Sequence, residues 1–200
     1  MRRLCIVLAA ALSACGEKQD EQAIRVHGQS EPPAGKNLPV VVQVPEFSFT
    51  ERNGKQMGPK ELLGKVWVAD FIFTNCPGPC PLMTLQMHRI QERFKSSDDL
   101  RLVSITVDPE RDTLPVLKEY ARKYQADPHK WFFLRGPRKE AHELAFKGFK
   151  QGSKADPLND HSIRFALVDR LGRIRNYYDG TDEKSMERLF SDLEALLSTS

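Results

Sequence analysis

Hydrophobic positions along the chain form short apolar runs that alternate with segments of helical spacing. Apolar, aromatic and β-branched residues fill 66–74 (VWVADFIFT), which predicts a buried strand. From Pro81 onward, apolar residues recur near the helical period, which predicts a helix. The intervening CPGPC sequence continues neither structure, because proline and glycine interrupt both. Cys76 and Cys80 are therefore expected on a strand-to-helix loop.

The remaining segments repeat this alternation. Further strands are predicted at 100–107, 131–134, 163–168 and 174–178, and further helices at 113–124, 138–149 and 182–197. Near the start of this pattern, Asn53-Gly54 follows an alternating stretch and predicts a hairpin. The order predicts an α/β fold with a mixed central sheet, helices on both faces and an added N-terminal hairpin. A cysteine pair that opens the first main helix gives this order a thioredoxin-like layout.

The N-terminus has the pattern of an export signal. Residues 1–14 combine a basic start, a short apolar run and small residues, a pattern too short for a comfortable membrane span. The sequence LSAC, which ends at Cys15, resembles the bacterial lipobox, and this implies a lipoprotein signal peptide that leaves Cys15 lipidated. Cys5 would leave with the signal. An ordinary cleaved signal and an uncleaved anchor remain alternatives. The expected location is the bacterial cell envelope, on the extracytoplasmic side of a membrane.

Composition predicts a flexible tether near the N-terminus and gives no support for a nucleic-acid partner. Residues 15–45 are polar, carry four prolines and lack a sustained period, so they are expected to be a flexible tether, followed by a folded domain at 46–200. Pairing of 40–44 as an edge strand would end the tether earlier. Loss of Arg2 and Arg3 with the signal leaves 28 of the 30 basic residues against 27 acidic ones, which gives no argument for nucleic-acid binding.

The two loop cysteines carry the candidate chemistry. A helix N-terminus stabilises thiolates, so both Cys76 and Cys80 are expected to ionise more easily than a free cysteine. The spacing alone allows a structural disulfide, a redox dithiol or half of a metal site. A disulfide across so short a loop removes little unfolded-chain entropy, which favours redox or metal chemistry. Among the five histidines, His161 stands apart because it ends a loop directly before a predicted strand.

Three ordered motifs resemble those of the Sco (SenC) family: FIFTNCPGPCP at 71–81, VDPERDT at 107–113 and DHS at 160–162. The resemblance implies a thioredoxin-like fold on which two cysteines and a downstream histidine bind copper, here Cys76, Cys80 and His161. It also implies a role in assembling the dinuclear copper centre of cytochrome c oxidase. The Pro-Gly-Pro spacer departs from the family, which commonly has an acidic residue there, and this affects partner recognition and metal release.

The leading hypothesis is a membrane-anchored copper chaperone whose partner is a copper-accepting oxidase subunit or another exported copper protein. Two soft thiolates and an imidazole suit copper, whereas structural zinc usually takes four protein ligands. With both thiolates ionised, Cu(I) leaves a local charge of −1 and Cu(II) a neutral site. The competing enzyme hypothesis is a thiol-disulfide oxidoreductase that reduces an exported partner, with Cys76 as the attacking thiol and Cys80 completing the dithiol.

Two further functional hypotheses stay open, a thiol peroxidase and a redox or copper sensor, and the former is the weaker because no arginine-supported peroxidatic pattern is clear. Met83 and Met87 follow the apolar face of their helix and are expected in the core rather than as copper ligands. Asp108 and Asp112 flank a predicted helix start. Capping is their default role, although the family motif implies that they also border the site.

Overall fold

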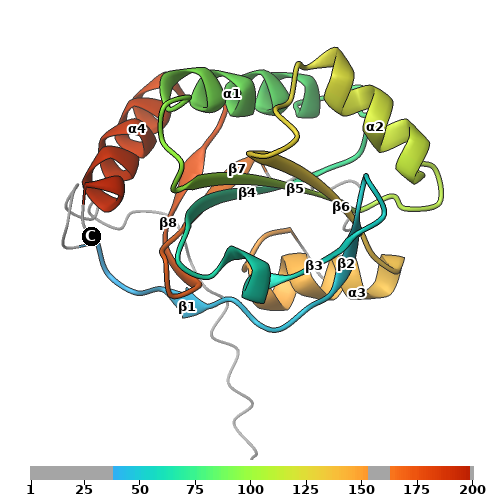
Figure 1. The fold of residues 1–200 in the computed structure, drawn as a ribbon, viewed down its shortest axis with the longest axis horizontal. Coiled ribbons are helices and arrows are strands. Elements are labelled where there is room, and N and C mark those ends of the chain that lie inside the picture. Colours follow the sequence, from blue (N-terminus) through green and yellow to red (C-terminus); the bar gives the residue numbers. More distant parts are fainter. Residues whose placement is uncertain (1–37, 153–162, 199–200) are drawn as a thin grey trace, which may run out of the picture. The chain divides into compact units, whose positions relative to one another are not determined.

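A mixed sheet with helices on both faces forms the centre of the molecule in the computed structural model, which describes residues 38–152 and 163–198 (Figure 1). The strand order is β1-β8-β7-β4-β5-β6-β2-β3. The strands are β1 (Val42–Gln43), β2 (Phe49–Glu51), β3 (Gln56–Met57), β4 (Val66–Ile72), β5 (Leu100–Thr106), β6 (Trp131–Arg135), β7 (Arg164–Val168) and β8 (Arg173–Asp179). The helical segments are η1 (Pro59–Leu62), α1 (Cys80–Arg93), α2 (Leu114–Lys123), α3 (Arg138–Glu143), η2 (Leu144–Gly148) and α4 (Glu183–Leu197).

The pairing of the central strands defines one functional edge of the sheet. β4 pairs parallel with β5, and β5 pairs parallel with β6. On its other side β4 pairs antiparallel with β7, with Trp67 opposite Val168 and Ala69 opposite Ala166. The end of β4 therefore lies at the same edge as the end of β5 and the start of β7. We call this edge, where β4 ends and β7 begins, the cysteine edge.

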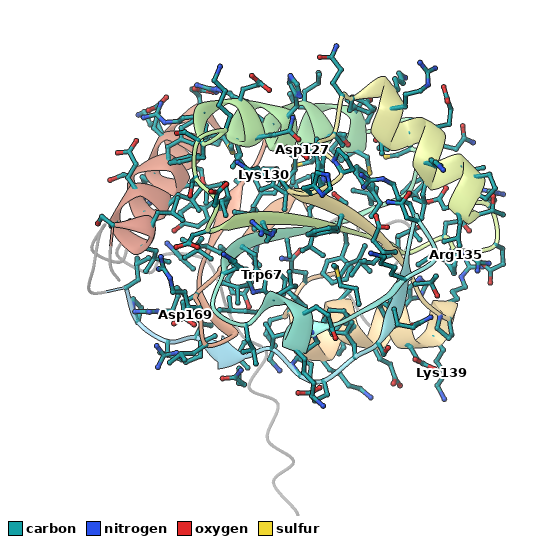
Figure 2. All side chains as sticks on the ribbon, viewed as in Figure 1. Trp67, Asp127, Lys130, Arg135, Lys139 and Asp169 are labelled. Carbon is teal, nitrogen blue, oxygen red and sulfur yellow. The ribbon has the colours of Figure 1, made fainter. Side chains whose placement is uncertain are left out.

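Strand alternation divides the core into two layers. Along β4, Val66, Val68 and Ile72 join the apolar cluster beneath α1, α2 and α4, whereas Trp67, Ala69 and Phe71 join the cluster on the α3 side (Figure 1). Figure 2 shows Trp67 inside the molecule and Lys139 on the outer side of α3. A strand buried on both faces accounts for the continuous apolar run in the sequence.

The predicted elements and the α/β class with a mixed central sheet are confirmed. The expected strand at 66–74 is β4, and the helix expected from Pro81 begins one residue earlier, at Cys80. The hairpin forms between β2 and β3, where Gly54 takes a φ of +90° that favours glycine. The helix expected at 138–149 has two parts, since α3 passes into a π-helical turn, η2.

The described residues before position 46 pack against the sheet. Leu38 and Val44 are buried, and β1 pairs antiparallel with β8, as the edge-strand alternative required. The described residues belong to one compact unit, whose bounds are 32 and 200. The expected signal peptide at 1–14 and Cys15 lie outside the described residues. Within 38–152 and 163–198, no helix has the length and apolar character needed to cross a membrane.

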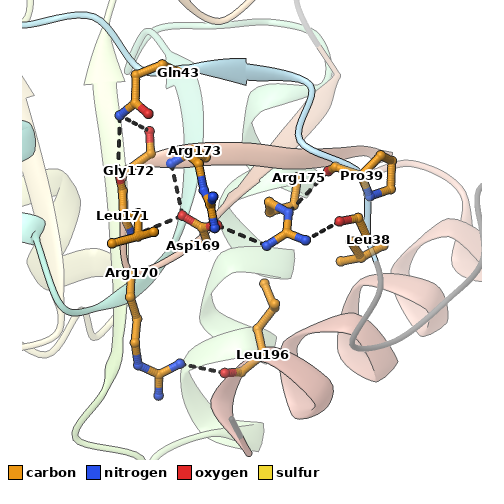
Figure 3. A network of polar contacts seen from close by, with 10 residues as sticks. All are labelled: Leu38, Pro39, Gln43, Asp169, Arg170, Leu171, Gly172, Arg173, Arg175 and Leu196. Atoms are coloured by element: carbon orange, nitrogen blue, oxygen red, sulfur yellow. Dashed lines mark hydrogen bonds and ion pairs between the residues drawn. The ribbon is translucent and has the colours of Figure 1, made fainter. Parts of the chain in front are cut away.

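A polar network closes the β7–β8 turn and secures the first described residues (Figure 3). The Asp169 carboxylate accepts hydrogen bonds from the backbone N–H groups of Leu171 and Arg173, at 3.0 and 3.1 Å. It also accepts from the guanidinium groups of Arg173 and Arg175, each at 2.9 Å. Arg175 in turn donates to the backbone carbonyl of Leu38. The network ties the N-terminal strand segment to the sheet.

Candidate functional site

The loop between β4 and α1 carries both cysteines, as the sequence predicted. After Ile72 the chain turns at once, because the backbone N–H of Cys76 donates to the carbonyl of Phe73 at 3.2 Å. The N–H of Gly78 then donates to the Cys76 sulfur at 3.4 Å. α1 begins at Cys80, so this residue occupies the first helical position. Hydrogen bonds between residues close in sequence, and the fixed backbone angles of the prolines, thus restrict the conformation of the loop.

Both cysteines are free and nearly buried, with Cys76 8% and Cys80 5% exposed. Burial, together with the neighbouring Cys76 side chain, raises the pKa of the Cys80 thiol to about 12. The prediction that both thiols ionise more easily than a free cysteine is therefore wrong for Cys80, because burial outweighs the effect of the helix N-terminus. The influence of Cys76 on this pKa also means that the two side chains are neighbours.

A second loop, between β5 and α2, fixes the cysteine loop in place. Asp112 is 1% exposed and accepts hydrogen bonds from the Thr74 N–H at 3.1 Å and from the Thr74 hydroxyl at 2.5 Å. The same carboxylate accepts from the Thr106 hydroxyl at 2.5 Å. Asp112 does not cap α2, whose N-cap residue is Thr113. Its contacts instead join the end of β4 to the end of β5. Thr74, one of the residues that it contacts, lies two positions before Cys76 in the sequence.

The first turn of α1 is also held from within. The Thr84 hydroxyl donates to the Cys80 carbonyl at 2.8 Å and lies 2.8 Å from the Tyr120 hydroxyl of α2. Tyr120 and Thr74 both line an open groove of about 420 Å³, together with Val116. The buried hydroxyl groups of Thr84 and Tyr120 therefore link α1, the helix that carries Cys80, to α2.

Asp70, on β4, is the buried acid that the sequence analysis did not single out. Its side chain is 0% exposed, and neither carboxylate oxygen has a hydrogen-bond partner among the described residues. Burial raises its pKa to about 7. The signal was present in the sequence, because a charged residue in the middle of an apolar strand is rare without a partner.

The other candidates take the roles expected of them. Met83 and Met87 are buried in the apolar core, which confirms that they pack rather than face an open site. His142 bonds the Val107 carbonyl at 2.8 Å. Within 38–152 and 163–198, no three His, Cys, Asp or Glu side chains come together as a metal site. The third predicted ligand, His161, lies outside those ranges.

Comparison with known proteins gives a consistent result. The sequence model of the family described as SCO1/SenC matches residues 39–198. A curated relative, the SCO1 protein homolog of Bacillus subtilis, is 36% identical over 162 residues, which cover 78% of this chain and 84% of that protein.

Two solved structures extend the comparison. BsSco, described as a member of the Sco family of cytochrome c oxidase assembly proteins with a disulfide switch, matches with a TM-score of 0.71 and 34% identity, over 81% of this chain and 98% of its own. Bradyrhizobium japonicum ScoI, solved with copper bound, matches with a TM-score of 0.63 and 27% identity, over 77% and 99%.

Proposed function

The chain belongs to the SCO1/SenC family, and from this premise we propose that it is a copper chaperone that binds one copper ion through Cys76, Cys80 and His161. In this proposal the ion is cargo, which the protein delivers to a copper-accepting subunit during assembly of cytochrome c oxidase. Two similarities support it: BsSco is a member of a family of cytochrome c oxidase assembly proteins, and the ScoI structure holds copper.

One observation carries the proposal: two free, neighbouring cysteines lie at the edge of the sheet where β7 begins. β7 starts at Arg164, three residues after His161 in the sequence. The antiparallel register of β7 with β4 brings the start of β7 to the end of β4, from which the cysteine loop leaves. This topology supports His161 as the third ligand.

The donor set fits copper better than other common metals. Thiolate sulfur and imidazole nitrogen are soft and intermediate donors, which suit copper, whereas magnesium and calcium prefer oxygen. Three protein ligands leave a coordination position for a ligand of the recipient. Such a position lets the recipient bind the ion before the donor releases it, which a carrier requires.

The test is anaerobic copper titration of residues 32–200, the compact unit, followed by X-ray absorption. The wild type is expected to bind one copper ion with two sulfurs and one nitrogen, and His161→Ala to lose the nitrogen. His129→Ala is the matched control, since His129 lies in a turn where its backbone N–H bonds Asp127. Absence of stoichiometric copper, or an unchanged nitrogen ligand in His161→Ala, would overturn the proposal.

We also propose that Cys15 is lipidated and anchors the domain to the extracytoplasmic side of a membrane. The support is the lipobox-like sequence LSAC, with 22 residues between Cys15 and the first described residue, Leu38. Cys15→Ser is expected to move the protein from the membrane fraction to the soluble fraction. Retention of that variant on the membrane would contradict the lipid anchor.

A thiol-disulfide oxidoreductase is the second candidate, favoured by the free and neighbouring state of the two thiols. The raised pKa of Cys80 leaves Cys76 as the attacking thiol in this scheme. The two functions separate in a complementation assay, because reduction requires both cysteines but no His161. Full function of His161→Ala would favour the oxidoreductase, and its loss the copper carrier.

A further inference from the structure

Resting on the proposed lipid anchor, we propose that one end of the domain lies on an anionic membrane surface. Four exposed apolar side chains make the contact, together with the basic side chains beside them. These four, which we call the turn patch, are Leu63, Leu171, Val40 and Val41. The contact directs the cysteine edge away from the lipid, toward a recipient protein.

The first pair of the turn patch, Leu63 and Leu171, flanks a backbone hydrogen bond between two loops. The N–H of Gly64, just before β4, donates to the carbonyl of Arg170, in the β7–β8 turn, at 2.9 Å. Leu63 is 56% exposed and Leu171 is 60% exposed. Two large apolar side chains are thus presented to solvent where these loops meet.

The second pair, Val40 and Val41, lies on the edge segment beside the same turn. The N–H of Val41 donates to the carbonyl of Ile174 in β8 at 2.8 Å, and the Gln43 amide donates to the Leu171 carbonyl at 3.1 Å (Figure 3). Both valines are about half exposed. Elsewhere among the described residues, the exposed large apolar side chains are Leu82, Leu85, Val116 and Phe146. Half of this class therefore gathers at one turn, and such a concentration is typical of an interaction surface.

The charge beside the turn patch is positive. Four basic side chains share two carboxylates at 2.8–3.1 Å: Lys65 and Arg170 with Asp99, and Arg173 and Arg175 with Asp169. Asp98 and Arg101, joined by a bond to the Asp98 carbonyl, add one charge of each sign, as do Lys60 and Glu61 of η1. Apolar side chains among an excess of basic groups suit a membrane surface that contains anionic lipids.

The turn patch lies at the opposite end of β4 from the cysteines. β4 runs through seven residues from Val66 to Ile72, and the cysteine loop follows Ile72. At about 3.3 Å per residue, the two ends of the strand are about 20 Å apart. Because β7 is antiparallel to β4, the β7–β8 turn lies at the start of β4. Lipid contact at the turn patch thus leaves the cysteine loop accessible to a recipient.

The proposed anchor keeps this end of the domain within reach of the lipid. Cys15 is separated from Leu38 by 22 residues, which span at most about 80 Å. The carbonyl of Leu38 accepts a hydrogen bond from Arg175, within the polar network of the turn (Figure 3). The chain therefore enters the described domain beside the turn patch. Lipidation of Cys15 would raise the local concentration of lipid there, so that a weak contact suffices.

The test locates the lipid surface by NMR. The full chain, purified with its attached lipid, is inserted into nanodiscs that contain phosphatidylglycerol and a lipid with a Gd(III) chelate in its headgroup. Paramagnetic broadening is expected to weaken the amide signals of Leu63 and Leu171, and to leave those of Asn75 and Gly78 in the cysteine loop unchanged. Discs of neutral phosphatidylcholine are expected to give a smaller loss, because the basic side chains then lack an anionic partner.

Paired leucine variants provide the control. Leu63→Ser/Leu171→Ser is expected to abolish the selective signal loss, whereas Leu82→Ser/Leu85→Ser is expected to retain it, since Leu82 and Leu85 are exposed on α1. Equal broadening at both ends of β4, or stronger broadening at the cysteine loop, would overturn the proposal. Self-association of the lipid-free chain that Leu63→Ser/Leu171→Ser abolishes would assign the patch to a second copy and would also overturn it.

The anchor and the contact are tested separately. If Cys15 carries no lipid, an N-terminal histidine tag holds the chain on a nickel-chelating lipid, and the same signals are measured. Loss of the anchor and loss of the contact then give different results. Copper titration of Leu63→Ser/Leu171→Ser is expected to match the wild type, so failure of the copper-carrying function is also distinguished from failure of the membrane contact.

Discussion

Two buried aspartates, one on β4 and one directly after the neighbouring strand β7, have opposite surroundings. Asp169, at the β7–β8 turn, accepts hydrogen bonds from backbone N–H groups and from the side chains of Arg173 and Arg175 (Figure 3). These bonds, opposed by burial, lower its pKa. Asp70, on β4, has no hydrogen-bond partner among the described residues, and burial raises its pKa to about 7.

The difference separates a carboxylate that supports the fold from one that is available for chemistry. A buried carboxylate with several donors is stabilised as an anion and holds its neighbours in place. A buried carboxylate without them costs folding free energy whenever it is ionised. Strand β4 therefore contains a group that lowers the stability of the folded protein at neutral pH.

The largest expected effect is the pH dependence caused by Asp70. Its pKa is raised from 3.8 to about 7 on folding, so its stabilising contribution is fully present below pH 3.8 and is lost as the pH rises through 7. Relative to Asp70→Asn, the unfolding free energy of the wild type should fall by about 4 kcal/mol between about pH 4 and pH 8. Urea denaturation of both proteins across this range measures the effect, and parallel pH profiles would contradict it.

Removal of the Asp169 carboxylate should lower the unfolding free energy, whereas removal of the Asp70 carboxylate should raise it at neutral pH. Asp169→Ala leaves two guanidinium groups and two backbone N–H groups without their acceptor, and is expected to lower the unfolding free energy by about 3 kcal/mol. Hydrogen exchange should also increase at Val41 and Val44, whose N–H groups bond the β7–β8 turn and β8. Unchanged stability would mean that the network does not hold the turn.

A smaller effect is expected where the two loops of the cysteine edge meet. Thr74→Val keeps the shape of the side chain but removes its 2.5 Å hydrogen bond to Asp112, which should cost about 1 kcal/mol and speed copper dissociation. Thr74→Ser retains the hydroxyl and is the matched control. Equal copper dissociation rates for the valine and serine variants would show that this bond does not position the cysteine loop.

The smallest effect is expected at an exposed ion pair on the helical surface. Lys147 lies 3.2 Å from Glu143, and both side chains are at least half exposed. Glu143→Gln should change the unfolding free energy by less than about 0.5 kcal/mol, because solvent and salt screen such pairs. A change as large as that of Asp169→Ala would contradict the distinction between buried and exposed carboxylates.

The sequence predicted the secondary structure around the site but not the pKa values of its side chains. The apolar run that forms β4 and the prolines around the cysteines were enough to predict the strand-to-helix loop. The helix N-terminus was visible in the sequence, but the burial of Cys80 was not, and burial determines its pKa. The sequence left open an edge strand at 40–44, and the burial of Leu38 and Val44 agrees with that alternative.

Long-range pairs explain the remaining gaps. The bond between Thr74 and Asp112 joins residues 38 positions apart, and local patterning carries no signal for it. The isolation of Asp70 depends on which residues of β5, α1 and α2 face it, and therefore on the register and packing of the whole sheet. The sequence could only mark Asp70 as an acid within an apolar strand.

Carboxyl-carbon NMR of residues 32–200 tests the contrast between the two buried aspartates most directly. In the copper-free protein, Asp70 is expected to titrate near pH 7 and Asp169 below its usual range. Titration of Asp70 near pH 4, at its usual value, would contradict the account.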